Sequence, residues 1–253
     1  RGVAGMAVAT TERCALRLEG VHVHDFSYGG GAVFHSSGTN LLEITRCRFE
    51  HIDGTAVAAF GGQVSITQTV FNDCHQGSGP GALLLGGVAQ GDLHGNVFWG
   101  CSSRDGDGGA IRGESGSVLW SWGDLFVGNE ANNGGAIDWS GAGGLNIFNG
   151  LFAGNATAAT PTPHALTLDG LPAPGCNHNL FDLDGIDGPD DLVLPQVDAG
   201  DGDSGAGGAI SMSASSWGQV VKTVFVANRA GAGGAISLSD EGEGPSDEPD
   251  EIL

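Results

Sequence analysis

Two short sequence motifs alternate eight times along this chain, and this repeat restricts the possible fold more than any other feature. The first motif is a pair of mostly small residues followed by alanine and an aliphatic residue, and it begins at positions 30, 54, 80, 108, 134, 163, 207 and 233. The second is a phenylalanine, at positions 26, 49, 71, 98, 126, 152, 181 and 225. A unit of 22–29 residues cannot bury its own apolar side chains. We therefore expect the units to stack along an axis around one continuous core, as in a solenoid.

The residues between the two motifs predict about three short strands in each unit. Apolar and polar residues alternate in segments such as 42–45 and 64–67, and Gly, Asn and Asp residues separate these segments. A second apolar position follows the first seven alanine-aliphatic pairs by about ten residues, at positions 44, 66, 93, 120, 147, 176 and 220. Phenylalanine comes five residues later, or six after Trp120. This spacing predicts a parallel β-helix, an all-β fold, with Trp120 in the core and the phenylalanines stacked inside at ~4.8 Å.

The expected domain is a solenoid over residues 1–238 of about eight coils, followed by an acidic tail or linker over 239–253. Three residues after several of the phenylalanines stands an asparagine, at positions 129, 155 and 228. We expect these amides to bond turn backbone and the neighbouring coil. The interval from each phenylalanine to the next Gly-Gly-Ala varies most, which predicts variable loops along one edge of the solenoid.

The two motifs resemble the polymorphic outer membrane protein repeat, whose signatures are GGAI and FxxN. GGAI stands at 108–111, 134–137, 207–210 and 233–236, and FxxN at 126–129, 152–155 and 225–228. The resemblance covers roughly residues 20–238, with degenerate motifs in the first coils and an acidic insertion at 182–206. It implies a single-stranded right-handed parallel β-helix of the pectin-lyase-like kind. It also implies a protein that is secreted or displayed on a bacterial cell surface, often as an adhesin.

The charge of the chain excludes several classes of partner. Acidic residues outnumber basic ones 30 to 9, which gives a net charge of −21. Such a surface repels nucleic acid, anionic lipid and polyanionic glycans. No run of ~18 apolar residues predicts a membrane-spanning helix. The chain begins at Arg1 with no visible signal peptide, and we expect a processed form or a piece of a longer protein.

The acidic insertion is the candidate metal site. Ca²⁺ binds six to eight hard oxygen ligands from a flexible chain, and this glycine-rich segment supplies many carboxylates. The candidate ligands are Asp182, Asp184, Asp187, Asp198, Asp201 and Asp203. A solvated acidic loop without metal is the alternative. The segment also contains Gly202-Asp203-Ser204-Gly205, which resembles the nucleophile tetrapeptide of trypsin-like proteases, but no pattern places a histidine and an aspartate beside it.

Cysteine and tryptophan residues give three further candidates. Cys74 and Cys101 occupy the same position in adjacent coils, which allows a disulfide or two buried thiols in place of asparagine. His22 and His24 face one side of a strand, but two ligands do not make a zinc site. Tryptophans outside the core are candidates for a platform on which sugar rings stack, at positions 99, 122, 139 and 217.

The sequence favours a structural, adhesive or filament-forming role over an enzyme. Hydrolases of polysaccharides need convergent carboxylates, and lyases need a base near bound Ca²⁺. Arg46 and Arg48 lie near no run of aspartates, and the pair Asp190-Asp191 lies in a loop. A polysaccharide lyase or hydrolase is the alternative. Open coil ends expose unpaired strand edges, so we expect further copies of the chain or another surface protein to bind there, and glycans are a further expected partner.

Overall fold

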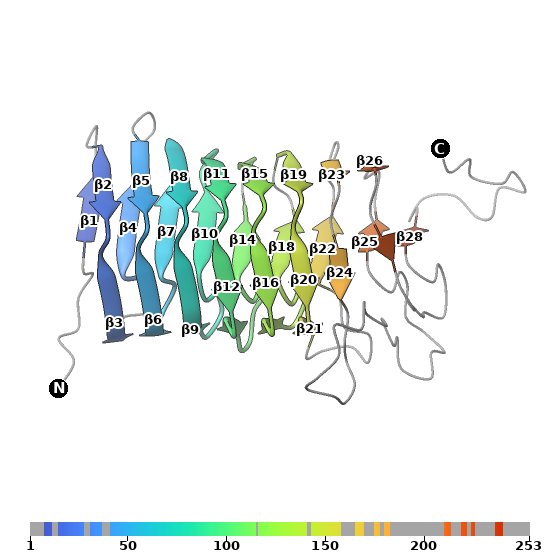
Figure 1. Cartoon of the computed structure of the whole chain (residues 1–253), viewed down its shortest axis with the longest axis horizontal. Coiled ribbons are helices and arrows are strands. Elements are labelled where there is room, and N and C mark those ends of the chain that lie inside the picture. The colour runs from blue at the N-terminus through green and yellow to red at the C-terminus, as the bar shows by residue number, and fades with distance from the viewer. Residues whose placement is uncertain are drawn as a thin grey trace, which may run out of the picture.

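The computed structural model is an all-β, parallel β-solenoid (Figure 1). It describes residues 8–11, 15–27, 31–36, 41–114, 116–140, 143–157, 165–169, 175–177, 180–182, 210–213, 219–221, 224–225 and 236–239. Each coil contributes strands to three sheets, called here sheets A, B and C, and every strand pairs in parallel with its equivalents in the neighbouring coils. Among these described segments there is no helix, and so none that could cross a membrane.

Sheets A and B each take one strand from successive coils. In the described part of the chain sheet A comprises β1 (Val8–Thr11), β4 (Val33–Ser36), β7 (Val57–Phe60), β10 (Leu83–Gly86), β14 (Ile111–Gly113), β18 (Ile137–Ser140), β22 (Leu166–Asp169), β25 (Ile210–Ser213) and β28 (Ile236–Ser239). Sheet B comprises β2 (Leu16–Glu19), β5 (Leu41–Thr45), β8 (Gln63–Thr67), β11 (Gln90–His94), β15 (Val118–Trp122), β19 (Leu145–Phe148), β23 (Gly175–Asn177) and β26 (Gln219–Val221).

Sheet C contains the phenylalanine strands and a short branch. Its main path is β3 (His22–Ser27), β6 (Arg48–Asp53), β9 (Val70–Gln76), β12 (Val97–Trp99), β16 (Leu125–Val127), β20 (Leu151–Ala153), β24 (Leu180–Asp182) and β27 (Val224–Phe225). The branch extends from the end of β9 through β13 (Ser102–Ser103), β17 (Glu130–Ala131) and β21 (Ala156–Thr157).

The predicted alanine-aliphatic anchors are in register through all eight units. The aliphatic residues pair in one row, at positions 33, 57, 83, 111, 137, 166, 210 and 236. Where side chains are described, from Val33 to Leu166, every one of these residues is fully buried. The motif therefore marks the inner row of sheet A, as the repeat predicts.

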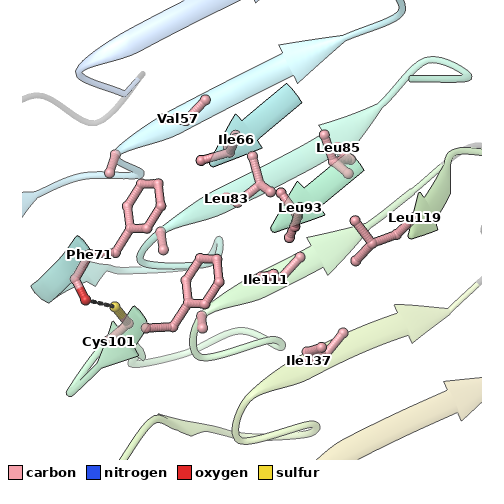
Figure 2. Close-up of a cluster of buried hydrophobic side chains, with 14 of the residues drawn as sticks. Val57, Ile66, Phe71, Leu83, Leu85, Leu93, Cys101, Ile111, Leu119 and Ile137 are labelled. Atoms are coloured by element: carbon pink, nitrogen blue, oxygen red, sulfur yellow. Dashed lines mark hydrogen bonds between the residues drawn. The ribbon is translucent and has the colours of Figure 1, made fainter. Parts of the chain in front are cut away.

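The phenylalanine column is present, with one correction. Phe49, Phe71, Phe98, Phe126 and Phe152 are fully buried, and their rings stack at 4.7–5.1 Å between centroids. These rings and the aliphatic side chains around them fill about five turns of the described core. Figure 2 shows part of this core, where Phe71 and aliphatic side chains such as Leu83 and Ile111 lie between the strands. The strand that carries Phe26 is shifted, because Val23 pairs with Phe49 and Phe26 pairs with Ile52. The prediction that Phe26 belongs to the column is therefore wrong.

The prediction that Trp120 lies in the core is also wrong. Trp120 pairs with Asp92 on the outer face of sheet B and is 37% exposed, and Ser121 takes the inner position in register with Leu93 and Ile147. The six-residue spacing from Trp120 to Phe126 was the sign of this, because Ser121 has the usual spacing of five. Burying Ser121 requires a partner, and its hydroxyl donates a hydrogen bond to Asp124 at 2.6 Å.

Backbone geometry explains the Gly-Gly part of the motif. Gly108 has a left-handed φ of 70°, which a residue with a side chain rarely adopts. A Cβ atom on Gly109 would stand only 2.1 Å from the carbonyl oxygen of Gly135 in the next coil. The first glycine thus allows the turn, and the second allows two coils to approach each other.

The expected asparagine stack is confirmed at the two positions where side chains are described. The Nδ2 groups of Asn129 and Asn155 donate to the carbonyl oxygens of Phe98 and Phe126, each at 3.0 Å. Asn129 also donates from Nδ2 to Oδ1 of Asn155 at 2.8 Å. The amides therefore satisfy buried turn backbone and tie one coil to the next. Asn228 lies outside the described residues.

Candidate functional site

An open groove on the outer face of sheet B is the candidate binding site. The outward side chains of three adjacent strands are aligned by the parallel register, so that Ser65, Asp92 and Trp120 form one row. The groove has a volume of about 520 Å³, within the range of small-molecule sites. Its lining includes Leu41, Gln63, Ser65, Gln90, Asp92, His94, Trp120 and Trp122.

Differences in side-chain size along the rows create the groove. Small or flexible side chains on β8 and β11 stand between Leu41 on β5 and the two indoles on β15. From β5 to β15 the site spans three interstrand spacings, or ~14 Å. The groove therefore has one aromatic wall and a polar floor.

The aromatic wall is held in place by ring stacking. Trp122 is stacked between His94, at 6.2 Å, and Phe148, at 4.0 Å between ring centroids. Trp120 stands two residues earlier on the same strand and is 37% exposed, and Trp122 is 39% exposed. Exposed aromatic area of this extent favours a ligand that can cover it.

The polar floor offers both hydrogen-bond acceptors and donors. Asp92 lies beside Trp120 and forms an ion pair with His94 at 2.9 Å. The amide groups of Gln63 and Gln90 can donate and accept at the same time. An aromatic wall with such a floor suits a ring that carries hydroxyl groups, because each hydroxyl group is both donor and acceptor.

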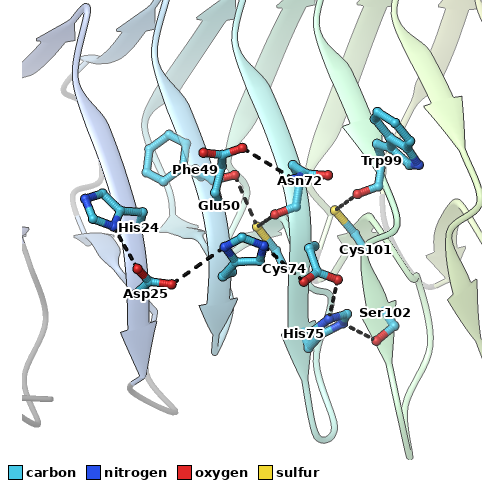
Figure 3. Close-up of polar contacts among 12 residues, drawn as sticks. His24, Asp25, Phe49, Glu50, Asn72, Cys74, His75, Trp99, Cys101 and Ser102 are labelled. Atoms are coloured by element: carbon cyan, nitrogen blue, oxygen red, sulfur yellow. Dashed lines mark hydrogen bonds and ion pairs between the residues drawn. The ribbon is translucent and has the colours of Figure 1, made fainter. Parts of the chain in front are cut away.

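A second polar cluster covers the outer face of sheet C (Figure 3). His22 and Arg48 both bind Glu50, the histidine at 2.8 Å, and Asn72 donates to the same carboxylate at 3.4 Å. Hydrogen bonding by Arg48, and then by His22, lowers the pKa of Glu50 below its ordinary value. His22 and His24 thus each contact a carboxylate, of Glu50 and Asp25 respectively.

The next row of this cluster runs across three coils. Asp25 accepts from His24 at 3.0 Å, and this hydrogen bond lowers the pKa of Asp25. His51 lies 3.6 Å from both Asp25 and Asp73. Asp73 also contacts His75, which contacts Ser102. Histidine and carboxylate therefore alternate along this row from coil to coil.

The cysteine pair is reduced in the structure. Cys74 and Cys101 are buried free thiols, so the disulfide that the sequence allows is not formed here. Each sulfur instead donates to a backbone carbonyl, of Phe49 and Phe71 respectively, at 3.7 Å (Figures 2 and 3). A hydrogen bond with Cys101, together with burial, raises the pKa of the Cys74 thiol well above its ordinary value. A thiol held protonated in this way is a poor nucleophile.

The predicted calcium ligands lie almost entirely outside the described residues. Asp182 ends strand β24, and its backbone pairs with Ala153. The other five, Asp184, Asp187, Asp198, Asp201 and Asp203, lie outside the described residues, as do Ser204 and Trp217. The described part of the chain contains no group of three or more His, Cys, Asp or Glu residues placed to hold a metal. Calcium binding by the insertion stays a prediction.

The remaining tryptophans are split between core and surface. Trp139, a platform candidate, is fully buried in sheet A, whereas Trp99 is 59% exposed on sheet C. The groove residues Gln63, Gln90, Asp92 and His94 were missed by sequence analysis. The signal for them was the position of Asp92, which the repeat places in the same row as Trp120 once the inner residue is assigned to Ser121.

A buried carboxylate at the turn between sheets B and C gives a pH-dependent contribution to stability. Asp124 is 1% exposed, and its Oδ1 accepts from the backbone and side chain of Asn96 at 2.7 and 2.9 Å. Burial raises the pKa of Asp124 from 3.8 to about 6. The folded state therefore favours the protonated acid, and the stability from this group is present below pH ~4 and lost as the pH rises through about 6.

Replacing Asp124 with asparagine, which keeps the shape of the side chain, is expected to remove this pH dependence. Between pH 4 and 7 the difference in unfolding free energy between D124N and wild type should shift by about 2–3 kcal/mol in favour of the variant. Urea unfolding at each pH measures this difference. The contributions of the other carboxylates to the pH dependence cancel, because both proteins contain them. A difference that stays constant from pH 4 to 7 would show that Asp124 ionises normally in the folded state.

Comparisons of the chain with protein-family models, with curated proteins and with solved structures find no match. The motif resemblance to the polymorphic outer membrane protein repeat therefore stays a prediction.

Proposed function

We propose that this chain is an extracellular or cell-surface β-solenoid that binds neutral glycans through the groove on sheet B, and so acts as an adhesive module. The observation that carries the proposal is the pair Trp120 and Trp122 beside Asp92 and two glutamine amides. Glycan binding typically combines a flat apolar surface with bidentate hydrogen bonds to hydroxyl groups, and the groove offers both. The net charge of −21 favours an uncharged glycan over a uronic-acid polymer.

The repeat supports the remaining parts of the proposal, which are the number of coils, display at the cell surface and binding at the coil ends. The eight motif pairs support about eight right-handed coils, with variable loops on one edge, and the motif resemblance supports display at a bacterial surface. Further copies of the chain or another surface protein would bind at the open coil ends. A glycan-cleaving enzyme is less well supported, because Asp92 is the one carboxylate among the described residues that line the groove.

The test uses soluble neutral hexasaccharides from cellulose, xylan and mannan, with oligogalacturonate as the charged comparison. Isothermal titration calorimetry and tryptophan fluorescence should detect binding of at least one neutral hexasaccharide and none of the charged one. Replacing Trp120 with alanine should weaken that binding by ~10–100-fold, because it removes an aromatic anchor.

The matched control is Trp99→Ala, which removes an exposed tryptophan from sheet C and leaves the groove intact. This variant should bind as wild type does. If no neutral hexasaccharide binds at millimolar concentration, or if both variants lose binding equally, the groove is not a glycan site.

A further inference from the structure

We propose that Ser102, His75 and Asp73 on sheet C form a second site, one that hydrolyses small carboxylic esters. Ser102 Oγ lies 2.7 Å from His75 Nδ1, and His75 Nε2 lies 2.8 Å from Asp73 Oδ1. In this arrangement the serine hydroxyl donates to Nδ1 of the imidazole, and the N–H at Nε2 donates to the carboxylate. The same chain of contacts activates a serine in hydrolases of unrelated folds, although there the serine contacts Nε2.

The solenoid backbone fixes this arrangement. Asp73 and His75 both lie on β9, and Ser102 begins β13, where it pairs directly with His75. Asp73 has a left-handed φ of 56°, and the equivalent residue in the next coil is Gly100, with a φ of 61°. A carboxylate with a left-handed backbone conformation thus stands where the next coil has glycine. It lies two residues before the histidine that it orients. Figure 3 shows His75 beside Ser102 at this edge of the sheet.

A pocket that is lined in part by Arg104 adjoins the serine. The pocket has a volume of about 320 Å³ and is lined by His75, Ser102, Ser103, Arg104 and Glu130. Arg17, Arg46, Arg48 and Arg112 all form ion pairs with carboxylates. Within the described residues Arg104 forms none of these ion pairs. In a chain with 30 acidic residues, an unpaired guanidinium in the same pocket is available to bind an anion that forms during a reaction.

The reaction proceeds in two balanced steps. Ser102 Oγ attacks the ester carbonyl carbon and its proton passes to His75 Nδ1, while Arg104 stabilises the oxyanion. The bond to the leaving alkoxide then breaks, and the alcohol departs with the proton from His75, which leaves an acyl group on Ser102. Water attacks this acyl group as His75 accepts a proton, and the carboxylic acid is released when the proton returns to Ser102 Oγ. Asp73 acts as a positioning residue that holds the imidazole.

Labelling with a fluorophosphonate, which forms a stable ester with activated serines, tests the nucleophile on the full chain. Mass spectrometry of peptides should find the label on Ser102 in wild type, no label in S102A, and a much slower reaction in H75N. Ser27→Ala is the matched control, because Ser27 lies on the same face of sheet C but bonds Asp53, at 2.8 Å, instead of a histidine. It should be labelled as wild type is.

Hydrolysis of p-nitrophenyl acetate gives the second readout, and S102A should lower its rate by ~10³-fold while S27A leaves it unchanged. Circular dichroism should show that S102A is folded, because the change removes a single half-exposed hydroxyl group. A wild-type chain in which Ser102 is unlabelled, or a rate that persists in S102A, would overturn the proposal. Glycan binding in the groove on sheet B is measured separately, so either proposal can fail without the other.

Discussion

Replacing Phe98 with alanine is expected to lower the free energy of unfolding by about 3–5 kcal/mol. Phe98 is fully buried at the centre of the phenylalanine column, with ring centroids 5.0 Å from Phe71 and 4.8 Å from Phe126. The change removes the transfer free energy of the ring and leaves a cavity between two coils that are each fixed by backbone hydrogen bonds, so the site cannot collapse around it. Urea unfolding followed by circular dichroism measures the loss.

Trp99→Ala is the matched control, because Trp99 is the next residue on β12 but points outward and is 59% exposed. The free energy of unfolding of this variant should fall by no more than about 0.5 kcal/mol. Similar losses for the two variants would mean that the column does not form the core.

Replacing Gly109 with alanine is expected to cost more than about 3 kcal/mol, even though one methyl group is added. Its Cβ would stand 2.1 Å from the carbonyl oxygen of Gly135, and 2.7 Å and 2.8 Å from the backbone nitrogen and oxygen of Glu130. These are backbone atoms of the next coil, so no side chain can rotate away. Two coils would have to separate and lose hydrogen bonds such as that from Gly109 N to Gly134 O.

Gly77→Ala is the control, because a Cβ atom at that position meets nothing within 4 Å and its φ is not left-handed. This variant should be neutral or slightly more stable, since alanine reduces the entropy of the unfolded chain. Thermal unfolding of both variants gives the comparison. An equal effect of the two alanines would refute the close approach of the coils at Gly109.

The stacking of the coils could be predicted from the sequence because each anchor repeats at a nearly constant spacing. The aliphatic row from Val33 to Ile236 is in register throughout, and the described phenylalanine rings from Phe49 to Phe152 stack as expected. Phe26 and Trp120 were placed wrongly because the spacing from one anchor does not fix which residue of a strand occupies a given row. Val23 takes the place in the phenylalanine row and Phe26 pairs with Ile52, whereas Ser121 takes the inner place next to Trp120.

The two candidate sites could not be predicted from the sequence in the same way. The groove depends on how far the side chains of four different coils project from sheet B, and no single coil contains it. Ser102 and His75 are 27 residues apart, and they meet because β13 pairs with the end of β9 in sheet C. The repeat shows which residues share a row, but the residue types at outward positions differ from coil to coil, so the repeat does not show which row forms a site.

One contact in sheet A bears on how such a protein can change its length. Trp139 fills the space above Gly113 so completely that a Cβ atom there would lie 2.4–2.6 Å from its ring. Coils joined only by matching anchors are interchangeable, and gene duplication or deletion can add or remove them without disturbing their neighbours. The coil that contains Trp139 needs a glycine at the position of Gly113 in the coil before it. A duplication or deletion that placed a larger residue against the Trp139 indole would therefore disturb this contact.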